Sequence, residues 1–128
     1  MKTTLIATAA ALLTVPVLAA GPAQASGGSD AVRRAGSCSG ATAWTIKAKP
    51  DDGRVEVETE VDSNRAGQTW RWSLRRDGVL VDSGRATTRG PSGSFSVTRR
   101  PAGAAGAAFA FRATNRATGE TCLARVSL

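Results

Sequence analysis

The sequence contains no histidine and no tyrosine, and aromatic residues fill only 5% of its 128 positions. Histidine is the side chain whose ordinary pKa suits proton transfer near neutral pH, and it is the most common metal ligand. Its absence also excludes Ser/His and Cys/His nucleophile pairs. We therefore expect a protein that is not an enzyme and that needs neither a cofactor nor a metal ion.

The sequence also lacks an apolar run long enough to cross a membrane. Its main apolar run, from Leu5 to Leu18, covers about 14 residues, whereas a spanning helix needs about 20. The run follows the positive start Met1-Lys2 and precedes Ala23-Gln24-Ala25, whose small side chains are typical of a signal-peptidase site. We therefore predict a signal peptide over residues 1–25, cleavage after Ala25, and a secreted, extracellular protein without a membrane span.

Cysteine is nearly absent, and its two copies, Cys38 and Cys122, are too few and too far apart for a zinc site or a redox motif. Secretion places both thiols in an oxidising compartment, and an even number leaves neither spare. Cys38 precedes the first predicted strand and Cys122 lies near the start of the last. We predict one structural disulfide between them.

The N-terminal part of the mature chain has no apolar periodicity. Residues 26–37 are rich in glycine, serine and alanine, a composition typical of a flexible tail. We therefore predict a flexible N-terminal tail over residues 26–37 and a single folded domain over residues 38–128.

From Ala43 onward the hydrophobic pattern has a period of two, which is typical of strands buried on one face. Turn residues separate seven such runs, at 43–49, 55–62, 70–75, 79–87, 94–99, 108–114 and 121–128. Seven short strands without a helix predict an all-β fold, a single antiparallel sandwich of the immunoglobulin-like or fibronectin III-like kind. A small barrel is the alternative.

The first predicted hairpin has a register that the side chains specify. A four-residue loop over residues 50–53 places Ile46 opposite Val57. It also places Lys47 opposite Glu56, so that apolar meets apolar and cation meets anion. Loops of three or five residues would reverse this parity, and we exclude them.

The second predicted hairpin turns at Asp77-Gly78, a pair that strongly favours a two-residue turn. Such a turn pairs Leu74 with Val81 on the buried face.

Three carboxylates, Glu56, Glu58 and Glu60, fall on one face of one predicted strand. Their spacing of about 6.5 to 7 Å is compatible with the paired carboxylates of a glycosidase. Strict alternation with buried residues instead indicates a solvent face, and Lys47 and Lys49 on the neighbouring strand supply counter-charges. We therefore interpret these glutamates as an exposed, charge-compensated surface.

Basic residues outnumber acidic ones by 17 to 10, and cleavage after Ala25 removes only Lys2, which changes the net charge from +7 to +6. Guanidinium groups bind phosphate, sulfate and carboxylate oxygens, so a stripe of arginines suits an anionic polymer. All three tryptophans fall on predicted core faces, which leaves no exposed indole to stack on bases and disfavours nucleic acid. The candidate stripe on the third and fourth strands consists of Arg71, Arg75, Arg76 and Arg85.

The loops offer an alternative site, because loops on a rigid sandwich often carry recognition. The longest lie at 63–68, 88–93 and 99–106. A secreted protease inhibitor would present one basic residue, such as Arg89 or Arg99, on a braced loop. The predicted disulfide lies far from these loops in sequence, so such bracing is not evident.

Five segments of the mature chain carry a resemblance to a known group of proteins. They are Pro50-Asp51-Asp52-Gly53-Arg54, Val61-Asp62-Ser63-Asn64-Arg65, Gln68-Thr69-Trp70-Arg71-Trp72, Thr88-Arg89-Gly90-Pro91-Ser92-Gly93-Ser94-Phe95 and Thr118-Gly119-Glu120-Thr121-Cys122. In these the chain resembles small secreted proteins of unknown function from actinobacteria such as streptomycetes. The resemblance covers most of the domain and implies no catalytic residue, ligand or partner. Chromophore-carrying antitumour apoproteins and subtilisin-inhibitor-like proteins carry two disulfides, which this chain cannot form, so their functions are not transferred.

The sequence therefore predicts a secreted, monomeric, non-catalytic binding protein. Its expected partner is an anionic cell-envelope polymer or another extracellular protein. The alternative is a protease inhibitor, or a small effector or toxin-like protein, that acts through its loops.

Overall fold

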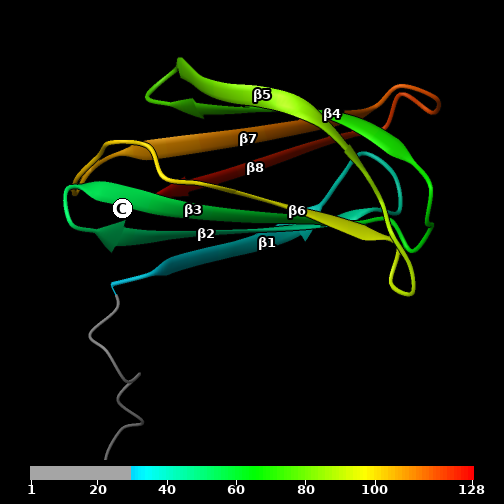
Figure 1. Ribbon diagram of the computed structural model, residues 1–128, viewed down its shortest axis with the longest axis horizontal. Coiled ribbons are helices and arrows are strands. Elements are labelled where there is room, and N and C mark those ends of the chain that lie inside the picture. Colours follow the sequence, from blue (N-terminus) through cyan, green and yellow to red (C-terminus); the bar gives the residue numbers. More distant parts are fainter. Residues whose placement is uncertain (1–29) are drawn as a thin grey trace, which may run out of the picture.

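The computed structural model describes residues 30–128, so the predicted signal peptide and residues 26–29 lie outside the described part of the chain. The described residues form eight antiparallel strands in two four-stranded sheets, which pack face to face as a β-sandwich (Figure 1). The strands are β1 (Val32–Ser37), β2 (Ala43–Asp51), β3 (Arg54–Asp62), β4 (Thr69–Arg76), β5 (Val79–Thr87), β6 (Ser94–Arg99), β7 (Ala108–Asn115) and β8 (Thr121–Ser127). The predicted all-β sandwich is confirmed, with one strand more than expected.

Sheet A has the strand order β1-β2-β3-β6, and sheet B has the order β5-β4-β7-β8. Because successive side chains of a strand point to opposite faces, every second residue enters the core between the sheets. Trp70 lies against Phe95 of the facing sheet with 6.3 Å between ring centroids, and Trp72 stacks on Phe111 at 6.0 Å. Both tryptophans are buried as predicted, whereas Trp44 is only partly buried.

Within the predicted flexible tail over residues 26–37, the structure corrects the part from 32 to 37, because Val32–Ser37 forms the edge strand β1. This strand pairs with β2, from Val32 opposite Ala48 to Ser37 opposite Ala43. The folded domain therefore starts before Cys38. Backbone hydrogen bonds and the Trp44 indole, which covers Gly36, hold β1, so its sequence needs no alternation of apolar residues.

The first hairpin has the predicted parity but a shorter loop. Asp52 and Gly53 form a two-residue turn, both with positive φ, and Ala48 rather than Ile46 lies opposite Val57. The expected four-residue loop is wrong because Pro50 belongs to β2. Val55 lies opposite it and donates its N–H to the Pro101 carbonyl, away from β2, so this pair needs no N–H from proline.

The second hairpin turns at Asp77-Gly78 as predicted, but a β-bulge between Leu74 and Arg75 shifts the register beyond it. Leu74 therefore lies opposite Asp82, and the predicted partner Val81 is wrong. A bulge inserts one residue into the longer strand, which a count from the turn cannot reveal.

The two open edges of the sandwich are closed in different ways. The predicted disulfide Cys38–Cys122 is confirmed, and it joins the segment after β1 to β8 across a sequence separation of 84 residues. Closing a loop of this length stabilises the fold by about 4 to 5 kcal/mol in the chain-entropy account. At the other edge Arg99 of β6 lies over the Trp72 ring, 4.8 Å from its centroid. Its Nε is 2.7 Å from an Asp82 carboxylate oxygen of β5.

Candidate functional site

The outer surface of sheet B carries a set of exposed arginines from all four strands. On β4, Trp70, Trp72 and Leu74 are buried, so the alternate residues Arg71 and Arg75 point away from the core. The same alternation exposes one arginine on each of the other strands. We call this surface the arginine face; its members are Arg71, Arg75, Arg85, Arg112 and Arg125.

The register places these arginines as neighbours across the sheet. Arg85 of β5 lies directly opposite Arg71 of β4. Arg112 of β7 lies opposite Ser73, which makes it the diagonal neighbour of both Arg71 and Arg75. Arg125 of β8 is diagonal to Arg112 in turn. Directly opposed residues are about 5 Å apart and diagonal ones about 7 to 8 Å, so the face presents a continuous oblique row of positive charge.

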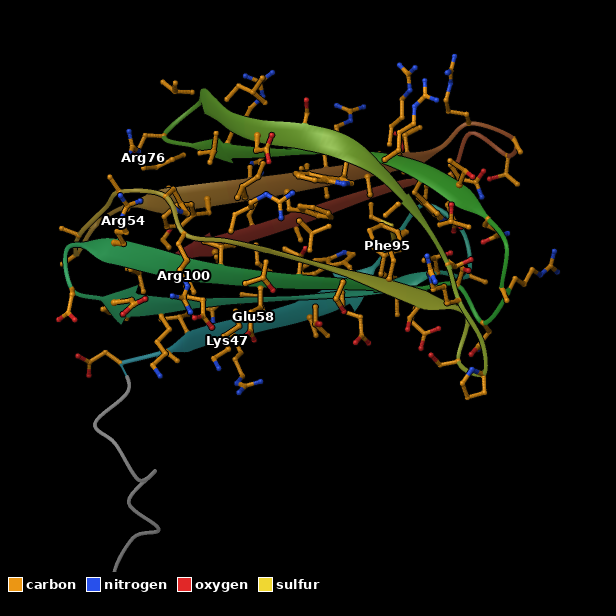
Figure 2. All side chains as sticks on the ribbon, in the orientation of Figure 1. Lys47, Arg54, Glu58, Arg76, Phe95 and Arg100 are labelled. Carbon is orange, nitrogen blue, oxygen red and sulfur yellow. A yellow bond between two sulfur atoms is a disulfide. The ribbon has the colours of Figure 1, made fainter. Side chains whose placement is uncertain are left out.

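No carboxylate compensates this row. None of the five arginines forms an ion pair with an acidic side chain of residues 30–128. Arg116, in the turn between β7 and β8, and Arg85 lower the pKa of Arg71 by repulsion between like charges, with a smaller contribution from desolvation. In Figure 2 nitrogen-tipped side chains project outward from this side of the sandwich. The face therefore attracts anions over its whole width.

The other residues of the arginine face are small or isolated. Serine, threonine and alanine occupy most of the remaining outward positions, such as Ser73 and Thr114. Two exposed leucines, Leu80 and Leu123, lie on the opposite edge strands β5 and β8, so they form no continuous apolar patch. The strands place no aromatic residue on this surface, because their tryptophans and phenylalanines are buried. The surface therefore offers charge and hydrogen bonds rather than stacking.

The predicted stripe coincides with the arginine face only in part. Arg71, Arg75 and Arg85 belong to it. Arg76 does not, because its side chain takes the inward direction at the end of the sandwich and donates a hydrogen bond to the carbonyl of Ala102. Figure 2 shows Arg76 at this end together with Arg54, which forms a β-bridge with Ala102.

The stripe predicted from the sequence does not include Arg112, Arg125 and Arg116. The first two occupy outward positions in predicted strands, and their alternation with buried phenylalanine, alanine and valine signals that they are exposed. Their membership of the same face depends on β7 and β8 lying beside β4, which only the strand order reveals.

The outer surface of sheet A has the opposite character. Its strands expose carboxylates on β3 beside cations on β1 and β2. Lys47 lies 3.9 Å from Glu58, and both are seen on the outer side of this sheet in Figure 2. Arg100 lies 2.9 Å from Glu56 and 3.7 Å from Asp51. These pairs support the interpretation of the glutamates as a compensated surface.

A cleft lies at one end of the arginine face, where the β3–β4 loop approaches the β7–β8 turn. Its volume is about 590 Å³, and its lining includes Gln68, Thr69, Arg85, Arg116 and Thr118. No acidic side chain lines it.

The loop arginines proposed for an inhibitor are held within the fold. The Arg99 guanidinium forms an ion pair with Asp82 and lies over the Trp72 ring, as described above. Arg89 donates its N–H to the Ser94 carbonyl, and its own carbonyl accepts the N–H of Gly93. These bonds close the turn over residues 89–94, and the Arg89 side chain itself is exposed.

No family profile matches the chain, and searches of curated proteins and of solved structures found no significant match. The resemblance to secreted actinobacterial proteins therefore stays a prediction. Within residues 30–128 no helix has the length and apolar character needed to span a membrane. The same residues contain no group of three or more cysteine, aspartate or glutamate side chains arranged to hold a metal ion.

Proposed function

We propose that this chain is a secreted, non-catalytic binding protein and that the arginine face holds an anionic polymer of the cell envelope. The observation that carries the proposal is the row of five uncompensated arginines across one whole sheet, beside a second sheet whose charges are balanced. Cations lie on the outer surfaces of both sheets, whereas carboxylates occupy outward strand positions of sheet A only. A bias toward arginine in composition does not account for the lack of carboxylates on sheet B, and this difference supports a role for that surface.

The chemistry of the row suits a repeating anion. Each guanidinium presents planar donors that match the oxygens of phosphate and carboxylate groups. The strands hold the Cα positions rigidly, so the spacing of the charges is set before binding. A polymer with one charge per unit gains contacts at successive arginines, whereas a single small anion meets only one or two of them.

The proposed setting is extracellular, in agreement with the Cys38–Cys122 disulfide, which persists in oxidising compartments. We also propose that the domain is immunoglobulin-like or fibronectin III-like. With β1 set aside, seven strands divide into a sheet of three and a sheet of four, the division typical of such domains.

A pull-down from envelope fractions and culture medium of the producing organism tests the proposal. The triple variant Arg71→Gln/Arg75→Gln/Arg85→Gln is compared with the wild type and with the control Arg33→Gln/Lys47→Gln/Lys49→Gln. The control removes three positive charges from sheet A, as many as the triple variant removes from sheet B. We expect the wild type and the control to retain an anionic wall polymer and the sheet B variant to lose it. Retention of a specific protein by all three chains, without polymer, would overturn the proposal and favour the loops.

A further inference from the structure

Three arginines lie close together at the end of the arginine face that is nearest to the β7–β8 turn. Arg71 lies between two other cations, Arg85 on β5 and Arg116 in the β7–β8 turn. Arg116 follows Asn115, whose partner on β4 is Trp70, so the turn brings Arg116 beside Thr69 and Arg71. Two of these arginines line the cleft described above. A group of three neighbouring cations thus lies at a concave site.

Both walls of this cleft are fixed by hydrogen bonds. On one side the buried Asn115 accepts the backbone N–H of Ala117 through its Oδ1 at 3.0 Å, which shapes the turn that carries Arg116. On the other side the buried Thr88 donates its backbone N–H to the Gln68 carbonyl, and its hydroxyl accepts the N–H of Gln68 at 2.9 Å. The cleft is therefore formed before any ligand arrives, which reduces the ordering that binding must impose.

The titratable side chains at this cleft are all arginines. From β5 it receives Arg85 and from the β7–β8 turn Arg116. The β3–β4 loop and the start of β4 contribute only the neutral Gln68 and Thr69, with Arg71 adjacent. The nearest acidic residue along the turn is Glu120. It accepts the backbone N–H of Thr42 at 3.1 Å and so is directed to the β1–β2 loop. Three cations without a counter-charge repel one another until an anion joins them.

We infer that this cleft binds one phosphate monoester group, such as the phosphorylated end of the polymer held by the arginine face. The inference rests on the proposed function and adds an end-recognition site to it. A monoester carries about two negative charges at neutral pH, whereas a phosphodiester within a chain carries one. A cleft lined by the guanidiniums of Arg85 and Arg116, with Arg71 nearby, stabilises the group with the higher charge more strongly, and Thr69 and Thr118 supply further hydroxyl donors.

Titration of the secreted chain with glycerol 3-phosphate, followed by amide chemical shifts, tests the inference. We expect the largest shifts at residues 67–69 and 115–118. We expect Arg116→Gln to weaken binding by about tenfold or more. Arg125→Gln removes the same charge from the far end of the face and should change the affinity less than twofold. Equal weakening by the two variants would overturn the inference.

The pH dependence supplies a second readout. The second pKa of a phosphate monoester is near 6, so its dianionic fraction rises by about tenfold between pH 5 and pH 7.5. The chain has no histidine, so no side chain with an ordinary pKa titrates in this interval. We expect the affinity for glycerol 3-phosphate to rise by about tenfold with the dianion, while the affinity for a phosphodiester such as glycerophosphocholine stays constant. A flat profile for the monoester would contradict the inference.

The two proposals fail separately. If the wild type retains the wall polymer but glycerol 3-phosphate shifts no amide of the cleft, end recognition is overturned and polymer binding stands. If glycerol 3-phosphate binds and the polymer is not retained, the proposed function is overturned. Phosphatase treatment of the polymer distinguishes the source of the group, because end recognition requires that this treatment abolish the effect of Arg116→Gln on polymer binding.

Discussion

The two outer surfaces of this sandwich are built by the same rule and reach opposite electrostatic results. On both sheets, charged residues occupy the alternate positions that face solvent. Sheet A exposes four carboxylates on β3, Glu56, Glu58, Glu60 and Asp62, beside Arg33, Lys47 and Lys49 on its neighbours. Sheet B exposes five arginines and no carboxylate at its outward strand positions. Either arrangement would keep the protein soluble, so the difference supports the proposal that sheet B has a ligand.

A charge reversal at the centre of sheet B should have the largest effect. Arg112→Glu removes a cation and places a carboxylate diagonal to Arg71 and Arg75, which gives sheet B the compensation that sheet A already has. We expect the affinity for a wall polymer or for inorganic polyphosphate to fall by more than tenfold, because each contact to an anionic group contributes about 1 kcal/mol or more. The matched control Arg33→Glu changes the same charge on sheet A. A similar loss in both variants would mean that only net charge matters.

The converse change should give sheet A some of the character of sheet B. Glu58→Gln/Glu60→Gln removes two of the four carboxylates of β3 and leaves Lys47 without its partner. We expect a weaker second binding site for polyphosphate, with a total affinity gain of a few-fold at low salt. Calorimetric stoichiometry measures it, and the site should survive Arg112→Glu. If the added binding disappears in that combined variant, the two surfaces are not independent.

The comparison of the two sheets also predicts that neutralising one cation stabilises the fold on sheet B and destabilises it on sheet A. Arg71 and Arg85 are like charges directly opposite each other, so Arg85→Gln should raise the thermal midpoint slightly, by about 1 °C. Lys47→Gln loses the ion pair with Glu58 and should lower the free energy of unfolding by about 0.2 to 0.5 kcal/mol. Thermal and urea unfolding at low salt measure both. A loss of stability in Arg85→Gln would show that sheet B is not electrostatically strained.

The smallest effect is expected at the edge between the sheets. The hydrogen bond from Arg99, together with that from the Ser83 backbone, holds the pKa of Asp82 below its ordinary value. A carboxyl whose pKa is lower in the folded state stabilises the fold above its unfolded pKa, near 4, and loses this contribution as the pH falls further. We expect Asp82→Asn to reduce the difference in thermal midpoint between pH 6 and pH 2.5. If the difference in thermal midpoint between the two pH values stays the same in this variant, Asp82 does not contribute to the loss of stability in acid.

Period-two alternation and turn chemistry predicted most of the fold, because both are local properties. They located seven of the strands, both hairpin turns and the buried side of β4 with Trp70 and Trp72. The edge strand β1 escaped this reasoning because backbone pairing and the cover of Gly36 by Trp44 hold it, rather than a buried apolar face. The bulge at Leu74 escaped it because nothing in the residues from 74 to 82 marks an unpaired position.

The candidate site was predictable only within β4, where alternation places Arg71 and Arg75 on one surface. Arg85 joins them because of the bulge: the predicted register, with Leu74 opposite Val81, would place it opposite Trp70 on the buried face, whereas the structure pairs it with Arg71. Arg112 and Arg125 join them through the pairing of β4 with β7 and of β7 with β8, contacts between residues distant in sequence. The predicted stripe includes Arg76, the neighbour of Arg75, although alternation directs its side chain inward. Arg116 depends on the turn that Asn115 shapes.

The salt dependence of polyphosphate binding tests the central claim most directly. If the five arginines of sheet B and Arg116 contact the polyphosphate, the binding constant should fall as salt is added. A plot of its logarithm against the logarithm of the salt concentration should then have a slope of about −4. Each single substitution by glutamine among these six should reduce the slope by about 0.7, whereas Arg33→Gln, Lys47→Gln and Lys49→Gln should leave it unchanged. Equal reductions from substitutions on both sheets, or no binding by the wild type, would contradict the assignment of function to sheet B.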